Sequence, residues 1–231
     1  MTINKMVRLA TAGQLSEIIT EMQQAADLFL EIGYGVSVFG SARIQPDSPY
    51  YAMALELGRR LAKAGITVIA GGGPGIMEAV NHGAFEAGGT SVGLNIRLPR
   101  ETDNNPYQTH SLHFKHFASR KTTFFAHSVG YIILPGGFGT LDEFFEVLTL
   151  VQTRKAPPAP IILVGSAYWS GLLDWIKAQT LALGLISPQD LNLFKVCDDA
   201  DAVMREIEAS CGDYVEGADC AVQPGQPPIP A

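Results

Sequence analysis

Short apolar runs alternate with helical stretches along most of the chain, and this alternation constrains the fold more than any other feature. The apolar, β-branched runs are residues 35–40, 66–70, 91–96, 131–134, 161–164 and 194–197. Helical apolar spacing marks residues 50–64, 76–87, 119–127, 141–152, 168–183 and 200–209. Strands that are apolar on both faces are typical of a parallel sheet covered by helices. The pattern predicts an α/β fold, a Rossmann-like, doubly wound and mainly parallel sheet flanked by helices.

Two terminal segments frame this repeating part. Residues 14–32 carry apolar side chains at helical spacing and are followed by Gly33, a suitable C-terminal stop. The C-terminal residues are rich in proline and glycine and poor in large apolar side chains. We therefore expect an N-terminal helical extension over 1–34, a Rossmann-like domain over 35–210 and a flexible tail over 211–231.

The charge and cysteine content narrow the possible partners. The net charge is −7, whereas general nucleic-acid binding usually needs a basic face. The three cysteines fit neither a zinc site nor a disulfide framework, and no apolar run is long enough to span a membrane. No secretory signal is evident at the N-terminus. These observations predict a cytoplasmic protein that binds neither nucleic acid nor membrane.

The first glycine-rich turn, residues 71–75 (GGGPG), joins an apolar run to a helical stretch. Glycines there let backbone N–H groups approach a ligand, and a helix N-terminus favours an anion. The alternative is a tight turn that needs glycine only for its backbone conformation. The turn matches neither the dinucleotide fingerprint GxGxxG nor a P-loop, which disfavours NAD and ATP.

A second turn, residues 135–143 (PGGFGTLDE), occupies the corresponding place in the second half. Thr140 suits an N-cap or a hydroxyl donor to phosphate. Glu143 follows three residues later, so the pair also fits a capping box, which would make Glu143 structural. Upstream, Arg120 and Lys121 stand at the start of a predicted helix, where the helix dipole disfavours cations. They are either a clamp for phosphate or carboxylate or a solvated basic pair.

Together these segments resemble the LOG ("Lonely Guy") family. Its motif PGGxGTxxE is matched at every fixed position, and the Arg-Lys pair and the upstream GGGPGIMEA also fit. The resemblance covers about residues 35–210 and implies a Rossmann-like, nucleotide-binding catalytic domain. Members were often labelled lysine decarboxylases, which implies a pyridoxal phosphate lysine, but no lysine here stands in a convincing cofactor context.

The resemblance implies a phosphoribohydrolase that splits a nucleoside 5′-monophosphate into free base and ribose 5-phosphate. The substrate would be a cytokinin riboside 5′-monophosphate, AMP or both, and no cofactor is implied. The family's catalytic pair falls on Arg120 and Glu143. The usual unit is a homodimer, and chains with extended termini assemble further.

Substrate contacts follow from the same resemblance and from the glycine turns. Glu143 would stabilise the positive charge of an oxocarbenium-like ribose and help activate water. The phosphate would lie on backbone N–H groups of the second turn. The expected substrate-binding residues are Ser41, Gly72, Gly73, Glu101, Lys121, Gly136, Gly137, Gly139, Thr140 and Thr149. Glu101 is placed only by its distance from Arg120.

Three other interpretations remain open or are disfavoured. A nucleotide sensor or a carrier, such as a molybdenum-cofactor carrier, would use the same sheet without turnover. A dinucleotide-dependent oxidoreductase would need GxGxxG, whereas the first apolar run ends in GSAR. His110, His113 and His116 form a loose cluster without a helical HxxxH, so we expect no metal site. The residues that recognise the base lie outside the shared motifs, so the preferred base is not predicted.

Overall fold

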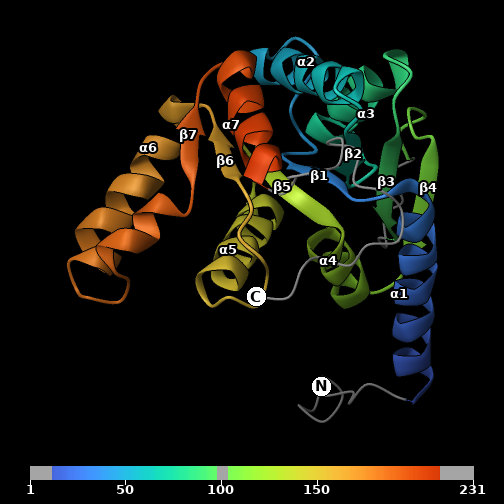
Figure 1. Ribbon diagram of the computed structural model, residues 1–231, viewed down its shortest axis with the longest axis horizontal. Helices are drawn as coiled ribbons and strands as arrows, with labels where there is room; N and C mark the ends of the chain where they lie inside the picture. Colours follow the sequence, from blue (N-terminus) through green and yellow to red (C-terminus); the bar gives the residue numbers. More distant parts are fainter. Residues whose placement is uncertain (1–11, 98–103, 214–231) are drawn as a thin grey trace, which may run out of the picture.

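The computed structural model describes residues 12–97 and 104–213, and its centre is a single parallel sheet (Figure 1). Across the sheet the strand order is β4-β3-β2-β1-β5-β6-β7, and every pairing among the described strands is parallel. The strands are β1 Gly35–Phe39, β2 Thr67–Ala70, β3 Ser91–Ile96, β4 His110–Phe114, β5 Ser128–Ile133, β6 Ile161–Val164 and β7 Lys195–Cys197. The predicted parallel α/β sheet is confirmed.

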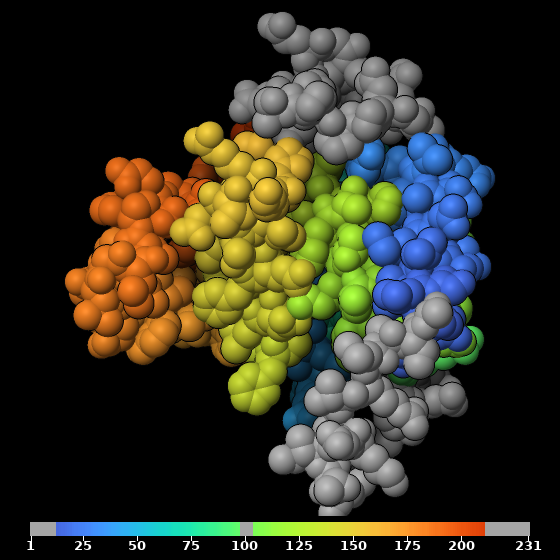
Figure 2. Space-filling model, turned by 90° about the horizontal axis from the view of Figure 1, so that it is seen from below, coloured from blue at the N-terminus to red at the C-terminus, as the bar shows by residue number. Residues whose placement is uncertain are grey.

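Helices cover both faces of the sheet. Their bounds are α1 Ala12–Ile32, α2 Pro49–Lys63, α3 Ile76–Glu86, α4 Phe117–Ala126, α5 Phe138–Gln152, α6 Ser166–Trp175 and α7 Ala200–Asp213. One apolar core joins α2, α3 and α7 to the sheet, and the other joins α1, α4, α5 and α6 to it. Figure 2 shows α1, α4 and α5 next to one another on the second face. The fold is therefore a three-layer, doubly wound α/β domain.

Alternation along the strands supplies both cores. In β1, Val36 and Val38 face the first core while Phe39 faces the second. In β5, Ile132 faces the first core and Ile133 faces the second. All five side chains are almost completely buried, which explains why the strands read as continuous apolar runs.

Helix α2 shows how local sequence sets an element boundary. Ser48 precedes it in an extended conformation, and its hydroxyl accepts a hydrogen bond from the N–H of Tyr50. Pro49 occupies the first helical position, where its missing N–H costs nothing. The chain leaves the helix at Ala64 and turns through Gly65, whose φ is 74°.

The main difference from the sequence prediction is β4, which was not among the predicted strands. The strand pairs with β3 from Val92↔His110 to Ile96↔Phe114. It lies at the edge of the sheet, and its burial alternates, so only part of it is apolar. Edge strands with one exposed face lack the signal of the inner strands.

Other element boundaries also differ from the prediction. Helix α5 starts at Phe138, three residues before the predicted start, and includes Gly139. The stretch predicted as one helix over 168–183 is α6 followed by a π-helical turn, Ile176–Leu181. A short 3-10 helix, Pro188–Asn192, was not predicted. Helix α7 continues to Asp213, so the first three residues of the predicted flexible tail are helical.

The N-terminal helix was predicted over 14–32, and α1 confirms it. It packs against α4 and β4 at the edge of the sheet, with Ala25 and Phe29 in the second core. In the ranges 12–97 and 104–213, none of the helices has the length and apolar character to cross a membrane.

Candidate functional site

Both glycine turns lie at the carboxyl-terminal edge of the sheet. The first follows β2 and the second follows β5, and β1 lies between those two strands. Ser41, just beyond β1, joins the two turns through its backbone. Its N–H donates to the carbonyl of Pro135 at 3.1 Å, and its carbonyl accepts from the N–H of Ile76 at 3.1 Å. The three segments thus converge where ligands bind in open α/β sheets.

The first turn needs glycine for its own structure. Gly72 and Gly75 have φ values of 76° and 67°. A Cβ on Gly72 would lie 1.9 Å from Oδ1 of Asn95, and one on Gly75 would lie 2.4 Å from the carbonyl oxygen of Ser41. The tight-turn alternative therefore holds at these two positions, and it is compatible with ligand binding by the same turn.

A polar network that was not predicted holds this turn. The N–H of Asn105 donates to the carbonyl of Gly72 at 2.8 Å, and its side-chain amide donates to the carbonyl of Gly73 at 3.1 Å. Gln108 also donates to the carbonyl of Gly72, at 3.1 Å. Both residues belong to the segment between β3 and β4, where isolated polar side chains carry no signal for such a contact.

Arg120, on α4, is buried against this same turn. Only 8% of the residue is exposed. Its Nε donates to the carbonyl of Leu94 at 2.7 Å, its Nη2 donates to the carbonyl of Gly71 at 3.3 Å, and its guanidinium carbon lies 5.3 Å from the centre of the Phe124 ring. For Arg120, the alternative of a solvated basic pair is wrong.

The buried guanidinium remains a cation beside the first turn, and it interacts electrostatically with Glu143 on α5. Burial lowers the pKa of Arg120, and the negative charge of Glu143 opposes that effect. Arginine nonetheless stays protonated in proteins. The two carbonyl contacts fix its position between Gly71, just after β2, and Leu94, within β3.

Glu143 lies in the second turn of α5, and the structure removes the capping-box interpretation. The N-cap of α5 is Gly137, and no side chain in the described part of the chain caps this helix. Thr140 is consequently the third helical residue and not the cap. It is buried against Gly136, where an added Cβ would lie 2.2 Å from the Thr140 hydroxyl.

The electrostatic surroundings of Glu143 are unusual for a surface helix. Burial raises the pKa of the partly buried Glu143 carboxyl to about 7, and the positive charge of Arg120 opposes that rise. Asp142 and Glu146 raise this pKa further, whereas Lys121 lowers it. A carboxyl group with a pKa near neutrality that interacts with a buried cation is typical of catalytic sites.

Lys121 connects the two helices that carry Arg120 and Glu143. Its ammonium lies 2.6 Å from Oδ2 of Asp142 and also pairs with Glu146 on the next turn of α5. The basic pair is therefore divided in function: Arg120 faces the first glycine turn, and Lys121 faces α5. A substrate contact by Lys121 stays a prediction.

The second turn presents an open helix N-terminus. Gly137, Phe138 and Gly139 are exposed, Phe138 at 92%. A Cβ on Gly137 or Gly139 would meet no described atom within 4 Å. The carbonyl of Gly136 accepts a hydrogen bond at 2.5 Å from the hydroxyl of Tyr168, on α6. Backbone N–H groups at such an end suit an anion.

Other predicted residues lie apart from this arrangement or outside the described residues. Glu101 falls in 98–103, outside the described residues. Thr149 lies on α5, about 120° around the helix axis from Glu143, and its hydroxyl donates to the carbonyl of Phe145 at 2.7 Å. Within 12–97 and 104–213, no three His, Cys, Asp or Glu side chains form a group that could hold a metal.

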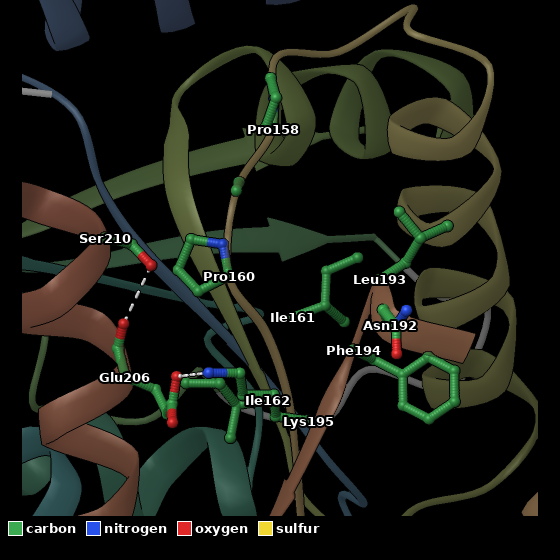
Figure 3. A pocket seen from close by; sticks show the side chains of 11 residues that line it. Pro158, Pro160, Ile161, Ile162, Asn192, Leu193, Phe194, Lys195, Glu206 and Ser210 are labelled. Carbon is green, nitrogen blue, oxygen red and sulfur yellow. Dashed lines mark hydrogen bonds and ion pairs between the residues drawn. The ribbon is translucent and has the colours of Figure 1, made fainter. Parts of the chain in front are cut away.

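A separate cavity of about 260 Å³ lies at the opposite, amino-terminal edge of β6 and β7 (Figure 3). Pro158 and Pro160 line it where the chain enters β6, together with the Lys195–Glu206 ion pair and Ser210. Because both strands begin here, this cavity is remote from the two glycine turns.

Comparison with known proteins supports one family. The sequence family described as possible lysine decarboxylase matches residues 77–207. The cytokinin riboside 5′-monophosphate phosphoribohydrolase of Rhodococcoides fascians is 28% identical over 179 residues, which cover 75% of this chain and 89% of that protein. The cytokinin riboside 5′-monophosphate phosphoribohydrolase LOG of Oryza sativa subsp. japonica is 35% identical over 182 residues, 77% of this chain and 74% of that protein.

The fold also occurs in carriers. The molybdenum cofactor carrier protein of Chlamydomonas reinhardtii superposes with a TM-score of 0.55 at 21% identity, covering 77% of this chain and 97% of that one. At this identity the likeness establishes a shared fold and nothing about the ligand.

Proposed function

Because this chain belongs to the LOG family, whose curated relatives are phosphoribohydrolases, we propose that it hydrolyses the N-glycosidic bond of a nucleoside 5′-monophosphate. The substrate is a cytokinin riboside 5′-monophosphate, AMP or both, and the products are the free base and ribose 5-phosphate. Residues 35–210 carry this function. The observation that carries the proposal is the buried Arg120 at the first glycine turn, in electrostatic contact with a carboxyl group whose pKa is about 7.

The phosphate binds at the start of α5. The exposed backbone of Gly137 and Gly139 offers N–H groups, and the helix dipole favours the anion. Gly136 and Thr140 complete this turn, and Lys121 adds positive charge nearby. Ser41, between the two turns, and Gly72 and Gly73 of the first turn contact the ribose or the base. Holding the phosphate in fixed dipoles orients the sugar for reaction.

Glu143 acts on the anomeric carbon. As the bond between C1′ and the base nitrogen breaks, positive charge develops on the ribose, and the carboxylate stabilises it. The same carboxylate accepts a proton from the water that attacks C1′, so the oxygen of that water ends on ribose 5-phosphate. The base leaves with a proton supplied from the solvent. Nothing in this sequence of steps requires a cofactor.

Arg120 favours the ionised form of the Glu143 carboxyl group, which catalysis needs. Burial favours the protonated form of Glu143, and the positive charge of Arg120 favours the ionised form. The guanidinium is itself fixed by two backbone carbonyls, so it is available as an oriented charge without direct pairing to a side chain. It also orients the substrate phosphate.

We also propose that the protein is cytoplasmic and works as a homodimer or a larger homo-oligomer. Large exposed apolar side chains support this assembly: Leu15, Ile19 and Leu30 on α1, Phe117 on α4 and Phe138 on α5. Analytical ultracentrifugation of the full chain tests it, and a single monomeric species at micromolar concentration argues against it.

The carrier alternative is supported by the shared fold of the molybdenum cofactor carrier. The carrier alternative and hydrolysis differ in the role of Glu143. A carrier has no anomeric carbon to stabilise, so it gains nothing from a carboxyl group near its neutral point beside a buried cation.

The test is incubation of the purified protein with AMP and with isopentenyladenosine 5′-monophosphate, with free base followed by chromatography. Glu143→Gln and Arg120→Ala are compared with Glu208→Gln and Arg205→Ala, which change exposed residues of α7. We expect release of base by wild type and both control variants, and a loss of about 100-fold or more in the two site variants. Binding of both nucleotides without cleavage by wild type would favour the carrier alternative.

A further inference from the structure

A buried carboxylate ties the N-terminal helix to the beginning of α4. Glu21, on α1, is 8% exposed. Its Oε1 accepts a hydrogen bond from the backbone N–H of Lys115 at 2.8 Å, and its Oε2 accepts one from the hydroxyl of Ser119 at 2.5 Å. These contacts join residues nearly one hundred positions apart, so they belong to the tertiary structure alone.

The two contacts span the junction between β4 and α4. Lys115 follows the last residue of the strand, and Ser119 lies in the first turn of the helix. The N-cap residue of α4, His116, gives no side-chain cap. The Ser119 hydroxyl also lies 3.0 Å from the carbonyl of His116, but its single proton can serve only one acceptor at a time. Glu21 therefore holds the residue before the N-cap and a side chain of the first turn, and its negative charge lies at the end of α4 where the helix dipole favours an anion.

Arg120 is the residue that directly follows Ser119. Its guanidinium reaches the carbonyls of Leu94 and Gly71 only while the first turn of α4 holds its place against β3 and the first glycine turn. An arginine side chain has many rotamers, so loosening its backbone disperses the charged group. We infer that Glu21 is a positioning residue for Arg120: it fixes the first turn of α4 and thereby keeps the guanidinium beside Glu143.

Glu17, one helical turn before Glu21 on α1, provides a natural comparison. It pairs with the ammonium of Lys115 at 2.7 Å and with Nε2 of His116 at 3.0 Å. These partners are side chains, and the carboxylate of Glu17 is 44% exposed. Exposed pairs of this kind contribute little to rigidity. Replacing Glu17 removes these side-chain pairs and keeps the backbone contact made by Glu21.

The consequence for structure is independent of any catalytic role. In protein labelled with ¹⁵N-arginine, the Nε–H signal of Arg120 is assigned by its loss in Arg120→Lys. We expect its hydrogen exchange to be about tenfold faster in Glu21→Gln and in Ser119→Ala, because both lose the contact at the first turn. Glu17→Gln should leave the exchange rate unchanged. Ser119→Ala keeps the Lys115 contact, so it serves as the second test if Glu21→Gln folds poorly.

The consequence for activity rests on the proposed function. The groups that face Glu143 are Arg120 and Lys121 from α4 and Asp142 and Glu146 from α5. Displacing the charge of Arg120 removes one of the two stabilising cations. We expect the acid limb of the kcat/KM profile to move upward by about half a pH unit in Glu21→Gln and Ser119→Ala, with a loss of about threefold or more at pH 6. Unfolding by urea is measured in parallel.

The outcomes distinguish the positioning role of Glu21 from the proposed hydrolysis. Faster Nε–H exchange in both variants supports the inference, even if wild type cleaves neither nucleotide, in which case only the proposed function fails. An unchanged Arg120 signal and an unchanged acid limb in both variants overturn the inference and leave the proposed function standing. A loss of stability with no change in exchange or in the acid limb also overturns it, because Glu21 would then be a purely structural residue.

Discussion

The ammonium of Lys121 lies 2.6 Å from Oδ2 of Asp142, and this ion pair joins α4 to α5 directly beside the proposed catalytic residues. Arg120 precedes Lys121, and Glu143 follows Asp142. A contact between one pair of neighbours therefore sets the separation of the other pair. Glu146 reinforces it from the next turn of α5.

We predict that Lys121→Met reduces kcat/KM for the cleaved nucleotide by about tenfold. The substitution keeps the apolar stem but removes the positive charge of Lys121. That charge joins the two helices and holds the pKa of Glu143 down. Steady-state kinetics at pH 6 and pH 8 measure the effect, which should be larger at pH 6. The matched control is Lys177→Met, at an exposed lysine outside the site. Equal kinetics for the two variants would show that Lys121 has no part in placing Glu143.

The pKa of Glu143 predicts the pH dependence of activity. Burial raises it to about 7, and catalysis requires the ionised carboxylate. Activity should therefore be low at pH 5 and rise to a plateau above neutrality, with a midpoint near the pKa. A kcat/KM profile over pH 5–9 checks this. A flat profile across pH 6–8 would contradict the assignment of Glu143 as the titrating group.

The same carboxyl group should cost stability at high pH. Its folded pKa, about 7, lies above the unfolded value of 4.5, so the folded state binds more protons in the interval between them. Stability from this group is consequently lost as pH rises from about 4.5 to 7. Glu143→Gln abolishes the titration. We expect the free energy of unfolding of this variant to exceed that of wild type by about 1–3 kcal/mol at pH 8 and by less at pH 5. Urea unfolding at both pH values measures the difference.

The fold was predictable because inner parallel strands are apolar on both faces. The edge strand β4 was not, since its burial alternates and its residues are partly polar. The start of α5 was misplaced because Gly137 and Gly139 suggest a loop, although backbone geometry makes them the cap and first turn of the helix.

The residues of the candidate site also divide into those that the sequence indicated and those that it did not. Arg120 and Glu143 were singled out because each stands in a short segment that resembles the LOG family, and their catalytic role stays a prediction. Glu21, Asn105 and Tyr168 were not, because each acts through contacts that span 32 residues or more and leave no local pattern. The Thr140–Glu143 capping box was a plausible local pattern that the actual helix start excludes.

The geometry of the first turn gives a prediction with an internal control. Gly72 and Gly88 both have a φ of 76°, so alanine is strained at either position by about 1 kcal/mol. Only at Gly72 would the new Cβ collide, 1.9 Å from Oδ1 of Asn95, whereas at Gly88 it meets no described atom within 4 Å. Gly72→Ala should therefore lower the free energy of unfolding by at least about 1 kcal/mol more than Gly88→Ala. Similar losses would mean that the Asn95 side chain moves aside freely.

The contact between Tyr168 and the second turn predicts a change in substrate binding. The Tyr168 hydroxyl donates to the carbonyl of Gly136. In a trans peptide, the N–H of Gly137 points opposite to that carbonyl, so the hydrogen bond aims this N–H toward the proposed phosphate. Tyr168→Phe should raise KM about three- to tenfold and leave kcat nearly unchanged, because it removes one support of the ground-state phosphate.

Tyr168 is 43% exposed, so the loss of its hydroxyl should not unfold the protein. Tyr34→Phe removes a hydroxyl just before β1, at the opposite edge of the sheet, and serves as the control. Calorimetric titration with ribose 5-phosphate measures the same support without turnover, and Tyr168→Phe should bind it more weakly by the same factor as KM rises. Unchanged affinity in the variant would show that the N–H of Gly137 is held by the α5 backbone alone, with no contribution from α6.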